Sequence, residues 1–554
     1  TYYARVKARN LLGQETGYTS LASTVTLTNT PVAAPLTFAA VDVSSMSVDW
    51  LANNNPDGTR YEAQVSTMPD FTVLTESSRT VLTQATFLTL QPNTTYFLQI
   101  KAINASNTDS AYLQPGSTVT LAAIPQALPY TAVSTTSLVA NWTRESNPGH
   151  TVFIAEIDDD PAFASVNNTS ITLNASAYFG NLALNATYYA RVKARNLLGQ
   201  ETGYVGLAST ITLVNPPVVV DASFTAVNVS SVTVDWQSNS NPGGTLYEAE
   251  AALDDSFAFI VASSITLSTD VVFSPLAPNT SHFVRVRAVN HGATPSQYLS
   301  LGSTVTIAQP PAVLPFTSVS TYAFQANWDA LDNPSYTRYV VEIDTASAFV
   351  SVDQTSVTYH PYAIFSSLAA NATYYVRIKT RNIVNAESAY TQLGSTVTWA
   401  AQPGAAAIEV LGPDSLRVNW QAMGNGSDTR FIAEISSAGF PGAATLSSVT
   451  YNAAAVFTDL IVNTTYAARV HAVNGAGVAT QSMDLGPAVT FANQPATFGI
   501  NLLGMSITSS SWRWLANSNP DGTLYVAEIS TMNSYVPVAV TSSTRVNQVY
   551  FLDL

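Results

Sequence analysis

The sequence predicts an all-β protein, a tandem array of seven-stranded antiparallel β-sandwiches. The first observation behind this prediction is a repeat, because tryptophans recur every 92 to 94 residues. The second is an alternation of apolar and polar residues, typical of strands with one buried and one solvated face. The third is that no stretch has helical spacing. About seven short strands separated by turn residues therefore fill each repeat.

Two anchor residues define the repeat. The first anchors are Trp50, Trp142, Trp236, Trp328, Trp420 and Trp514. A second anchor follows each of the first five tryptophans by 46 residues. These second anchors are Tyr96, Tyr188, His282, Tyr374 and Tyr466. Residues 1–18 recur unchanged at 187–204, which indicates growth by duplication.

The strands and turns of a repeat can be placed from local patterns. Alternation predicts strands at 45–50, 59–65, 116–122 and 187–196. The Asn-Pro-Asp-Gly segments at 55–58 and 519–522 are typical turns.

Prolines near the end of each repeat predict short, stiff joints, because proline fixes φ and cannot donate to a strand ladder. The predicted pieces are 1–30 (the last two strands of a first repeat), the repeats 31–123, 124–215, 216–309, 310–401 and 402–493, and 494–554 (the first five strands of a last repeat). Strands of this length make each repeat roughly 30 Å long, so we expect a rod.

Residues 90–96, LQPNTTY, resemble the corner motif Leu-x-Pro-x-Thr-x-Tyr of the fibronectin type III domain. The tryptophan 46 residues upstream and Ala102-Ile103-Asn104 downstream match as well. The resemblance implies an immunoglobulin-like sandwich within a large repetitive surface or secreted protein. It also implies that the tryptophan fills the core and that the corner tyrosine hydroxyl bonds the backbone. His282 departs from this pattern, as do Leu184, Ala370 and Val462 at the corner proline position.

Composition limits the function classes. The chain of 554 residues has a net charge of −15, only 10% charged residues and no cysteine. Negative charge argues against nucleic acid and anionic membranes as partners. Absent cysteine excludes disulfides, thiol catalysis and cysteine-ligated metals. No apolar run is long enough for a membrane span. No catalytic, cofactor or metal motif stands out, so we expect a non-enzymatic protein without a cofactor.

Basic residues cluster on the outward side of the strand that starts at the second anchor. The candidate basic-aromatic stripe comprises Arg191, Lys193, Arg195, Arg285, Arg287, Arg377, Lys379 and Arg381, with Tyr189, Phe283 and Tyr375. One interpretation is a surface for an acidic glycan or another cell-surface ligand. The other is ion pairing within the sheet, because a recurring glutamate (such as Glu156) faces the same way on the expected neighbouring strand.

Glycosylation sequons recur in register before the second anchor. They lie at Asn93, Asn185, Asn279, Asn371 and Asn463. In a secreted chain each could accept a glycan. The alternative is a structural asparagine in a tight turn.

Aligned on the repeat, residues 1–30 and 494–554 are complementary parts of one sandwich. The simpler interpretation is a segment of a longer array. The other is head-to-tail polymerisation, in which the final strands of one copy complete the first strands of another. Either interpretation, like the low charge, favours self-association, head-to-tail or lateral.

We therefore expect a structural component of an extracellular or cell-surface fibre or filament, adhesive or self-associating and built from stiff repeats. The alternative is an accessory stalk of a secreted polysaccharide-degrading enzyme or adhesin, whose functional module lies outside these residues.

Overall fold

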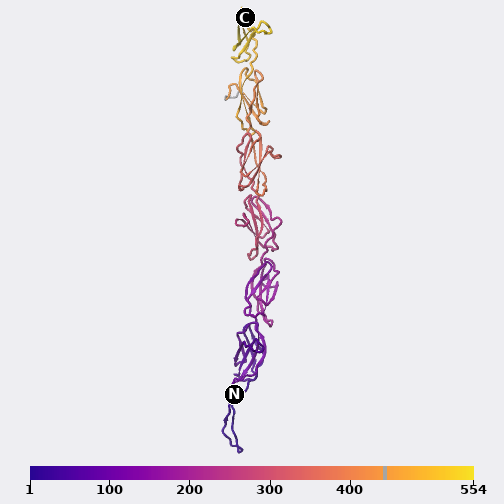
Figure 1. Cartoon of the computed structure of the whole chain (residues 1–554), viewed down its shortest axis with the longest axis vertical. Coiled ribbons are helices and arrows are strands. Elements are labelled where there is room, and N and C mark those ends of the chain that lie inside the picture. Colours follow the sequence, from indigo (N-terminus) through magenta and orange to yellow (C-terminus); the bar gives the residue numbers. More distant parts are fainter. Residues whose placement is uncertain (441–445) are drawn as a thin grey trace. The chain divides into compact units, whose positions relative to one another are not determined.

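The computed structural model describes residues 1–440 and 446–554, and all its regular elements are β-strands (Figure 1). The chain divides into two compact units. The first comprises Thr1–Ala226, Thr233–Phe273 and Phe283–Ser303, and the second comprises Val227–Val232, Ser274–His282 and Thr304–Leu554. The boundaries of the repeats stay a prediction. Among the described residues, none forms a helix that could cross a bilayer.

Repeat 124–215 illustrates the sandwich, whose strands we name A, B, C, C′, E, F and G in chain order. They are β10 (Ala127–Thr131), β11 (Leu138–Trp142), β12 (Val152–Asp158), β13 (Asn168–Thr172), β14 (Ser176–Phe179), β15 (Thr187–Arg195) and β16 (Val205–Ile211). Strands A-B-E form a three-stranded sheet and C′-C-F-G a four-stranded sheet. All pairs are antiparallel. The alternation in the sequence explains why these segments form strands of a sandwich. Along strand F, for example, buried residues that face the core alternate with half-buried residues that face outward.

The other repeats follow the same order in both units. Residues 31–123 contain β3 (Val32–Val41), β4 (Met46–Leu51), β5 (Arg60–Ser66), β6 (Glu76–Thr80), β7 (Gln84–Phe87), β8 (Thr95–Ile103) and β9 (Leu113–Val119). Residues 216–309 contain β17 (Phe224–Val227), β18 (Val232–Asp235), β19 (Leu246–Ala252), β20 (Ile260–Thr266), β21 (Asp270–Phe273), β22 (Ser281–Val289) and β23 (Leu299–Val305). Residues 310–401 contain β24 (Ala312–Val313), β25 (Phe324–Asp329), β26 (Arg338–Asp344), β27 (Gln354–Thr358), β28 (Tyr362–Phe365), β29 (Thr373–Arg381) and β30 (Thr391–Val397).

The remaining strands belong to repeat 402–493 and the two partial pieces. Residues 402–493 contain β31 (Gly404–Ala405), β32 (Glu409–Val410), β33 (Leu416–Gln421), β34 (Arg430–Ser436), β35 (Leu446–Thr450), β36 (Ala454–Phe457), β37 (Thr465–Val473) and β38 (Met483–Val489). The first piece is a hairpin of β1 (Arg5–Val6) and β2 (Thr19–Ser20). The last piece contains β39 (Leu502–Met505), β40 (Ser509–Arg513), β41 (Tyr525–Ile529), β42 (Val540–Thr544) and β43 (Gln548–Leu552). The predicted all-β class and strand-rich repeats are confirmed.

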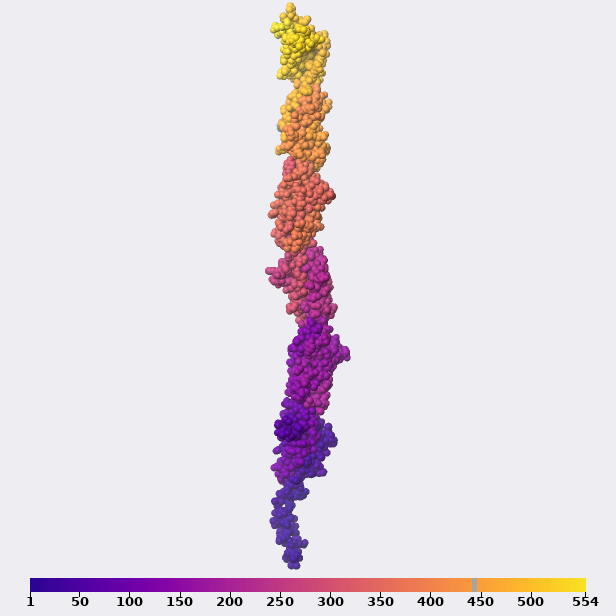
Figure 2. Space-filling view, turned by 45° about the vertical axis from the view of Figure 1, so that its right-hand side comes forward, coloured from indigo at the N-terminus to yellow at the C-terminus, as the bar shows by residue number. Residues whose placement is uncertain are grey.

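Each complete repeat has a core built around its tryptophan, which is buried between the two sheets. Figure 2 shows the outer surface that encloses these cores. Trp142 is 1% exposed and packs against Phe153 on strand C, with ring centroids 5.7 Å apart. The equivalent rings of the other repeats pair in the same way. These pairs are Trp50–Tyr61, Trp236–Tyr247, Trp328–Tyr339, Trp420–Phe431 and Trp514–Tyr525. Trp514 is only half-buried, because residues 494–554 supply no strand F to cover it.

Predicted strand boundaries differ from the structure at strand G. We expected this strand at 116–122, whereas β9 spans Leu113–Val119. The reason lies at Thr120, whose hydroxyl accepts a hydrogen bond from the Thr94 amide (3.0 Å) and donates one to the Gln91 carbonyl (2.7 Å). The chain therefore leaves the ladder after Val119 and binds the E–F turn.

A tyrosine opening strand F ties down the E–F turn. The Tyr96 hydroxyl accepts a hydrogen bond from the Gln91 amide at 2.9 Å. Tyr188, Tyr374 and Tyr466 form the same bond, at 2.9, 3.0 and 3.0 Å. The resemblance to fibronectin type III domains implied this bond. All four rings are buried.

His282 occupies the tyrosine position in repeat 216–309 and cannot reproduce the bond. Its Nε2 lies 3.5 Å from the Ala277 carbonyl oxygen, and its buried Nδ1 has no partner among the described residues. Burial lowers the pKa of this imidazole and so favours its neutral form. This corner lacks the amide bond that the other repeats form.

We predict that His282→Tyr stabilises repeat 216–309 by about 1 kcal/mol, because the hydroxyl restores the corner hydrogen bond. The gain should grow as the pH falls below about 6.5, since the unfolded histidine then takes up a proton that the folded one excludes. Thermal unfolding and hydrogen exchange at the Ala277 amide would measure this. The control is His360→Tyr, at an exposed histidine. Equal effects of both variants, or none from His282→Tyr, would contradict the prediction.

Candidate functional site

The outward face of the four-stranded sheet carries an arginine on strand F opposite a glutamate on strand C. Arg191 pairs in register with Glu156, and its Nη2 lies 2.7 Å from a carboxylate oxygen. Its guanidinium also lies between the rings of Phe163 and Tyr204, at 4.2 and 4.0 Å from their centroids. The charge is therefore balanced by the carboxylate and covered by two aromatic faces.

This arrangement recurs, but its rings are not those predicted. Arg285 contacts Glu250, Phe257 and Tyr298; Arg377 contacts Glu342, Phe349 and Tyr390; Arg469 contacts Glu434 and Phe440. We expected Tyr189, Phe283 and Tyr375 beside the cations. The contacting rings come instead from the C–C′ loop and from the residue directly before strand G. Their recurrence at the repeat period is the signal that could have identified them.

The remaining cations of the stripe pair with carboxylates as well. Lys193 and Arg195 share Glu201 at 2.5 and 2.9 Å, which holds the pKa of Glu201 below its usual value. Lys379 and Arg381 share Glu387 in the same way, at 2.7 and 2.5 Å. Arg287 binds Glu248 at 2.6 Å. All eight candidate stripe residues are thus ion-paired, which supports the interpretation as intra-sheet pairs over that of a free cationic surface.

The five sequon asparagines lie between consecutive repeats. Asn93 is 0% exposed, and its backbone has a φ of +43° in the E–F turn. Its Nδ2 donates to the Thr151 hydroxyl at 2.8 Å, and its Oδ1 accepts from the Leu197 amide at 2.7 Å. Both partners belong to the next repeat, one in its B–C turn and one in its F–G loop. One side chain therefore binds two loops of its neighbour.

The other turn asparagines make equivalent contacts. Asn185 binds Thr245 and the His291 amide, Asn279 binds Thr337 and the Ile383 amide, Asn371 binds Thr429 and the Gly475 amide, and Asn463 binds Thr523. The Nδ2–Oγ1 distances lie between 2.8 and 3.1 Å. The pattern thus holds in both compact units.

A second asparagine, in the B–C turn, binds the linker between repeats. Asn147 accepts from the Ala123 amide and donates to the Ala123 carbonyl, both at 2.8 Å. Its primary amide thus satisfies both polar groups of one linker residue. The equivalent pairs are Asn55 with Asn29, Asn241 with Asn215, Asn333 with Gln309, Asn425 with Ala401, and Asn519 with Asn493.

A third asparagine, at the end of strand F, bridges backwards. The Asn196 Oδ1 accepts from the Leu198 and Gln200 amides, which closes the F–G turn. Its Nδ2 donates to the Thr120 carbonyl of the preceding repeat at 3.2 Å. Equivalent donors are Asn104 to Thr26, Asn290 to Thr212, Asn382 to Thr306, and Asn474 to Thr398. We call these three classes together the junction asparagines.

The contacts favour the second of the two interpretations of the sequons, that of a structural asparagine. Asn93, Asn185, Asn279 and Asn371 are buried, and the amide nitrogen that would carry a glycan donates a hydrogen bond at all five sites, Asn463 included. A glycan there has no space in the folded array. The structural role is therefore the one that the geometry supports.

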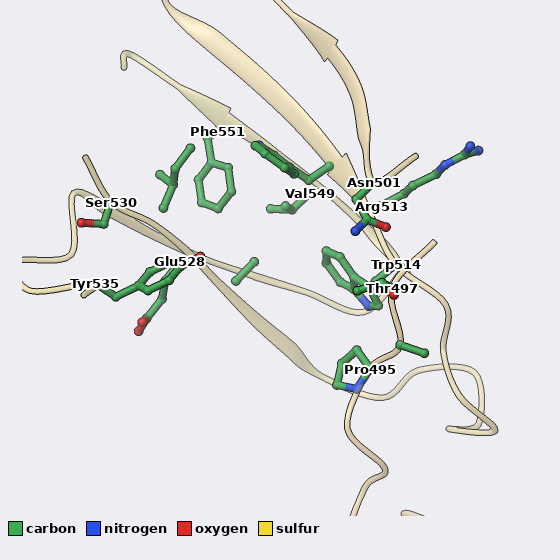
Figure 3. A pocket seen from close by; sticks show the side chains of 14 residues that line it. Pro495, Thr497, Asn501, Arg513, Trp514, Glu528, Ser530, Tyr535, Val549 and Phe551 are labelled. Carbon is green, nitrogen blue, oxygen red and sulfur yellow. The ribbon is translucent and has the colours of Figure 1, made fainter. Parts of the chain in front are cut away.

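The described residues hold no group of three or more histidine, aspartate or glutamate side chains placed to bind a metal ion. A cavity of about 430 Å³ lies between the sheets of residues 494–554 (Figure 3). Apolar side chains from both sheets line it, among them Trp514, Ile529, Val549 and Phe551. In complete repeats, strand F covers this part of the core.

Comparisons with known proteins add little. No family model matches the chain, and no curated protein does. Solved structures of tandem fibronectin type III domains do match. The FN1–FN3 domains of chicken CNTN1 are 17% identical, with a TM-score of 0.20, over 50% of this chain and 99% of that chain. A two-domain segment of chicken tenascin is 13% identical, with a TM-score of 0.26, over 33% of this chain and 100% of that chain.

At these TM-scores the likeness carries no argument, so the fold assignment rests on the sheets themselves. The A-B-E and C′-C-F-G sheets, the buried tryptophan and the tyrosine corner together make the repeats fibronectin type III-like.

We predict that the five turn asparagines are bare in folded protein, even from a host that glycosylates secreted chains, because the junction excludes a glycan. Glycopeptide mass spectrometry would test this. Asn228, an exposed sequon asparagine between strands A and B of repeat 216–309, is the internal control for glycosylation competence. A glycan on Asn93 in protein whose Leu197 amide stays protected from exchange would contradict the prediction.

Proposed function

We propose that the chain is a non-enzymatic structural component of an extracellular or cell-surface fibre, in which stiffly joined sandwiches act as spacers. The observation that carries this proposal is the set of junction asparagines. Each of the four junctions between complete repeats has one from the E–F turn, one from the B–C turn and one from the F–G loop.

Bending at such a junction would break several hydrogen bonds together. A typical bond contributes about 1 kcal/mol, and a buried group left unpaired costs about 1–3 kcal/mol. A flexible Gly/Ser linker would carry no such cost. Between Ala123 and Gln126 the linker has neither glycine nor serine, and Asn147 binds Ala123. These features favour a spacer whose repeats keep their relative orientation under load.

The surface is consistent with this role. Only 10% of the residues are charged, and the eight cations of the candidate stripe are paired with carboxylates. Few charges must therefore be separated or desolvated when such surfaces meet. Self-association, head-to-tail or lateral, is part of this proposal. A glycan or another surface ligand would have to bind elsewhere than at these paired cations.

The stiffness of one junction can be measured directly. Because the chain has no cysteine, spin labels can be placed selectively at Ser77→Cys and Thr169→Cys, exposed equivalent positions in adjacent repeats. We predict a narrow distance distribution that broadens in Asn93→Gly. Glycine accepts the φ of +43°, so this substitution removes only the side-chain hydrogen bonds.

The matched control is Asn181→Gly. Asn181 also has a left-handed backbone, with a φ of +56°, but it is exposed. We expect this variant to leave the distribution unchanged. A distribution that is already broad in the parent chain, or that Asn93→Gly leaves narrow, would overturn the proposal of stiff junctions.

A further inference from the structure

The two edges of the four-stranded sheet are unequally protected. At the strand G edge the ladder with strand F is interrupted by a register shift in four repeats. Strand G also contains glycines with positive φ, such as Gly302 (+89°) and Gly394 (+101°), or prolines such as Pro115. Bulges, left-handed glycines and prolines all hinder pairing with a further strand.

The strand C′ edge contains no glycine in repeats 124–215, 216–309, 310–401 and 402–493, and among the described residues of these four repeats only 216–309 has a register shift between strands C and C′. Its strands β13, β20, β27 and β35 contain no charged residue and no proline. Their pairing with strand C is regular in three of the four repeats. They consist mainly of serine, threonine and aliphatic residues, which suit a strand. Their outer backbone groups are unpaired, as in any edge strand.

Each of these edges also exposes two apolar side chains, which we call the edge patch. The members are Ile171 and Leu173, Ile265 and Leu267, Val357 and Tyr359, and Val449 and Tyr451. The strand residues are 57% to 69% exposed. The first member of each pair lies in the strand, and the second lies in the bend that directly follows it.

Repeat 31–123 is a natural contrast. Its strand β6 carries Glu76 and Arg79, and Arg79 stands where the others have Ile171, Ile265, Val357 and Val449. Arg79 forms an ion pair with Glu62 at 3.1 Å. A charge on an edge strand opposes pairing with another strand. Repeat 31–123 therefore has a C′ edge protected by charge, whereas the four repeats of residues 124–493 have the same fold with an uncharged C′ edge.

We propose that the uncharged C′ edges of residues 124–493 pair laterally with the C′ edges of a second copy of this chain. In such a pair the two strands continue one sheet across the contact and bring their edge patches together. This inference rests on the proposed structural function and names the surface through which copies associate.

Charge selects a second copy as the partner. The chain has a net charge of −15, so two copies repel each other least strongly where the residues in contact carry no charge. The C′ edges meet this condition on both sides of the contact, whereas a polycation or polyanion would find no counter-charge on them. One chain offers four such edges, so several copies can be cross-linked, and weak single contacts add up.

The test uses the full chain and a variant that copies its first complete repeat. We expect Ile171→Arg, Ile265→Arg, Val357→Arg and Val449→Arg, combined, to weaken association by about tenfold or more in concentration. Sedimentation velocity and light scattering over a concentration series would measure this. Hydrogen exchange should also slow in β13, β20, β27 and β35 when the parent chain associates.

A matched pair of double variants separates the edge from a general charge effect. Ile171→Arg with Val357→Arg removes two edge patches. Leu198→Arg with Val384→Arg adds the same charge at F–G loop residues of the same repeats, which are 61% and 60% exposed. Threonine at the four edge positions, a good strand former, should weaken association without adding charge and guards against misfolding by arginine.

The outcomes are distinct. Loss of association in the edge variants but not in the loop variant supports the proposal. Equal loss of association in the edge and loop variants overturns edge pairing, and so does association that survives the four edge substitutions. Neither result bears on the spacer function, which the spin-label measurement tests separately. A parent chain that stays monomeric at all concentrations overturns lateral pairing as well.

Discussion

Where one sandwich meets the next, buried backbone N–H and C=O groups must find hydrogen-bond partners. The joints, and with them the array of repeats, depend on this constraint. Buried N–H and C=O groups need partners, and at the end of a sandwich the strand ladders cannot supply them. Asparagine has one acceptor and a two-proton donor on the same short side chain, so it can replace a peptide group. Aspartate would lack the donor and add a buried charge. This explains why three asparagines recur at each complete junction.

Much of the fold followed from the sequence, because the repeat and the period-two alternation are strong local signals. The spacing of the tryptophans and corner tyrosines defined the repeat, and the resemblance to fibronectin type III domains implied their place in the core. The junctions were harder to identify. Asn55 and Asn519 were read as turn residues, which they are, but their linker contacts join segments 26 residues apart. Local patterns carry no information about which loop faces a turn across a joint.

On the outward face of the four-stranded sheet, too, the sequence predicted only part of the contacts. Alternation placed Glu156 and Arg191 on one face, and the antiparallel register brings them together. The ring of Tyr204 could not be assigned to Arg191 from strand periodicity, because a bulge shifts the register of strand G between Tyr189 and Arg191. A bulge is a three-dimensional event with only a weak trace in the sequence. The pairing of charges was predictable, whereas their aromatic covering was not.

The junction asparagines have a consequence for how such a chain can change in length. At one end, each complete repeat carries the turn asparagine of a joint and the threonine carbonyl that directly follows strand G. At its other end it carries the threonine and the two loop asparagines of the preceding joint. Any complete repeat can therefore follow any other, and a whole repeat can be gained, lost or moved without changing the contacts of a joint. The identity of residues 1–18 and 187–204 indicates duplication within the array. Gain or loss of half a repeat would leave a joint without its partners, so the length of the array should change by whole sandwiches.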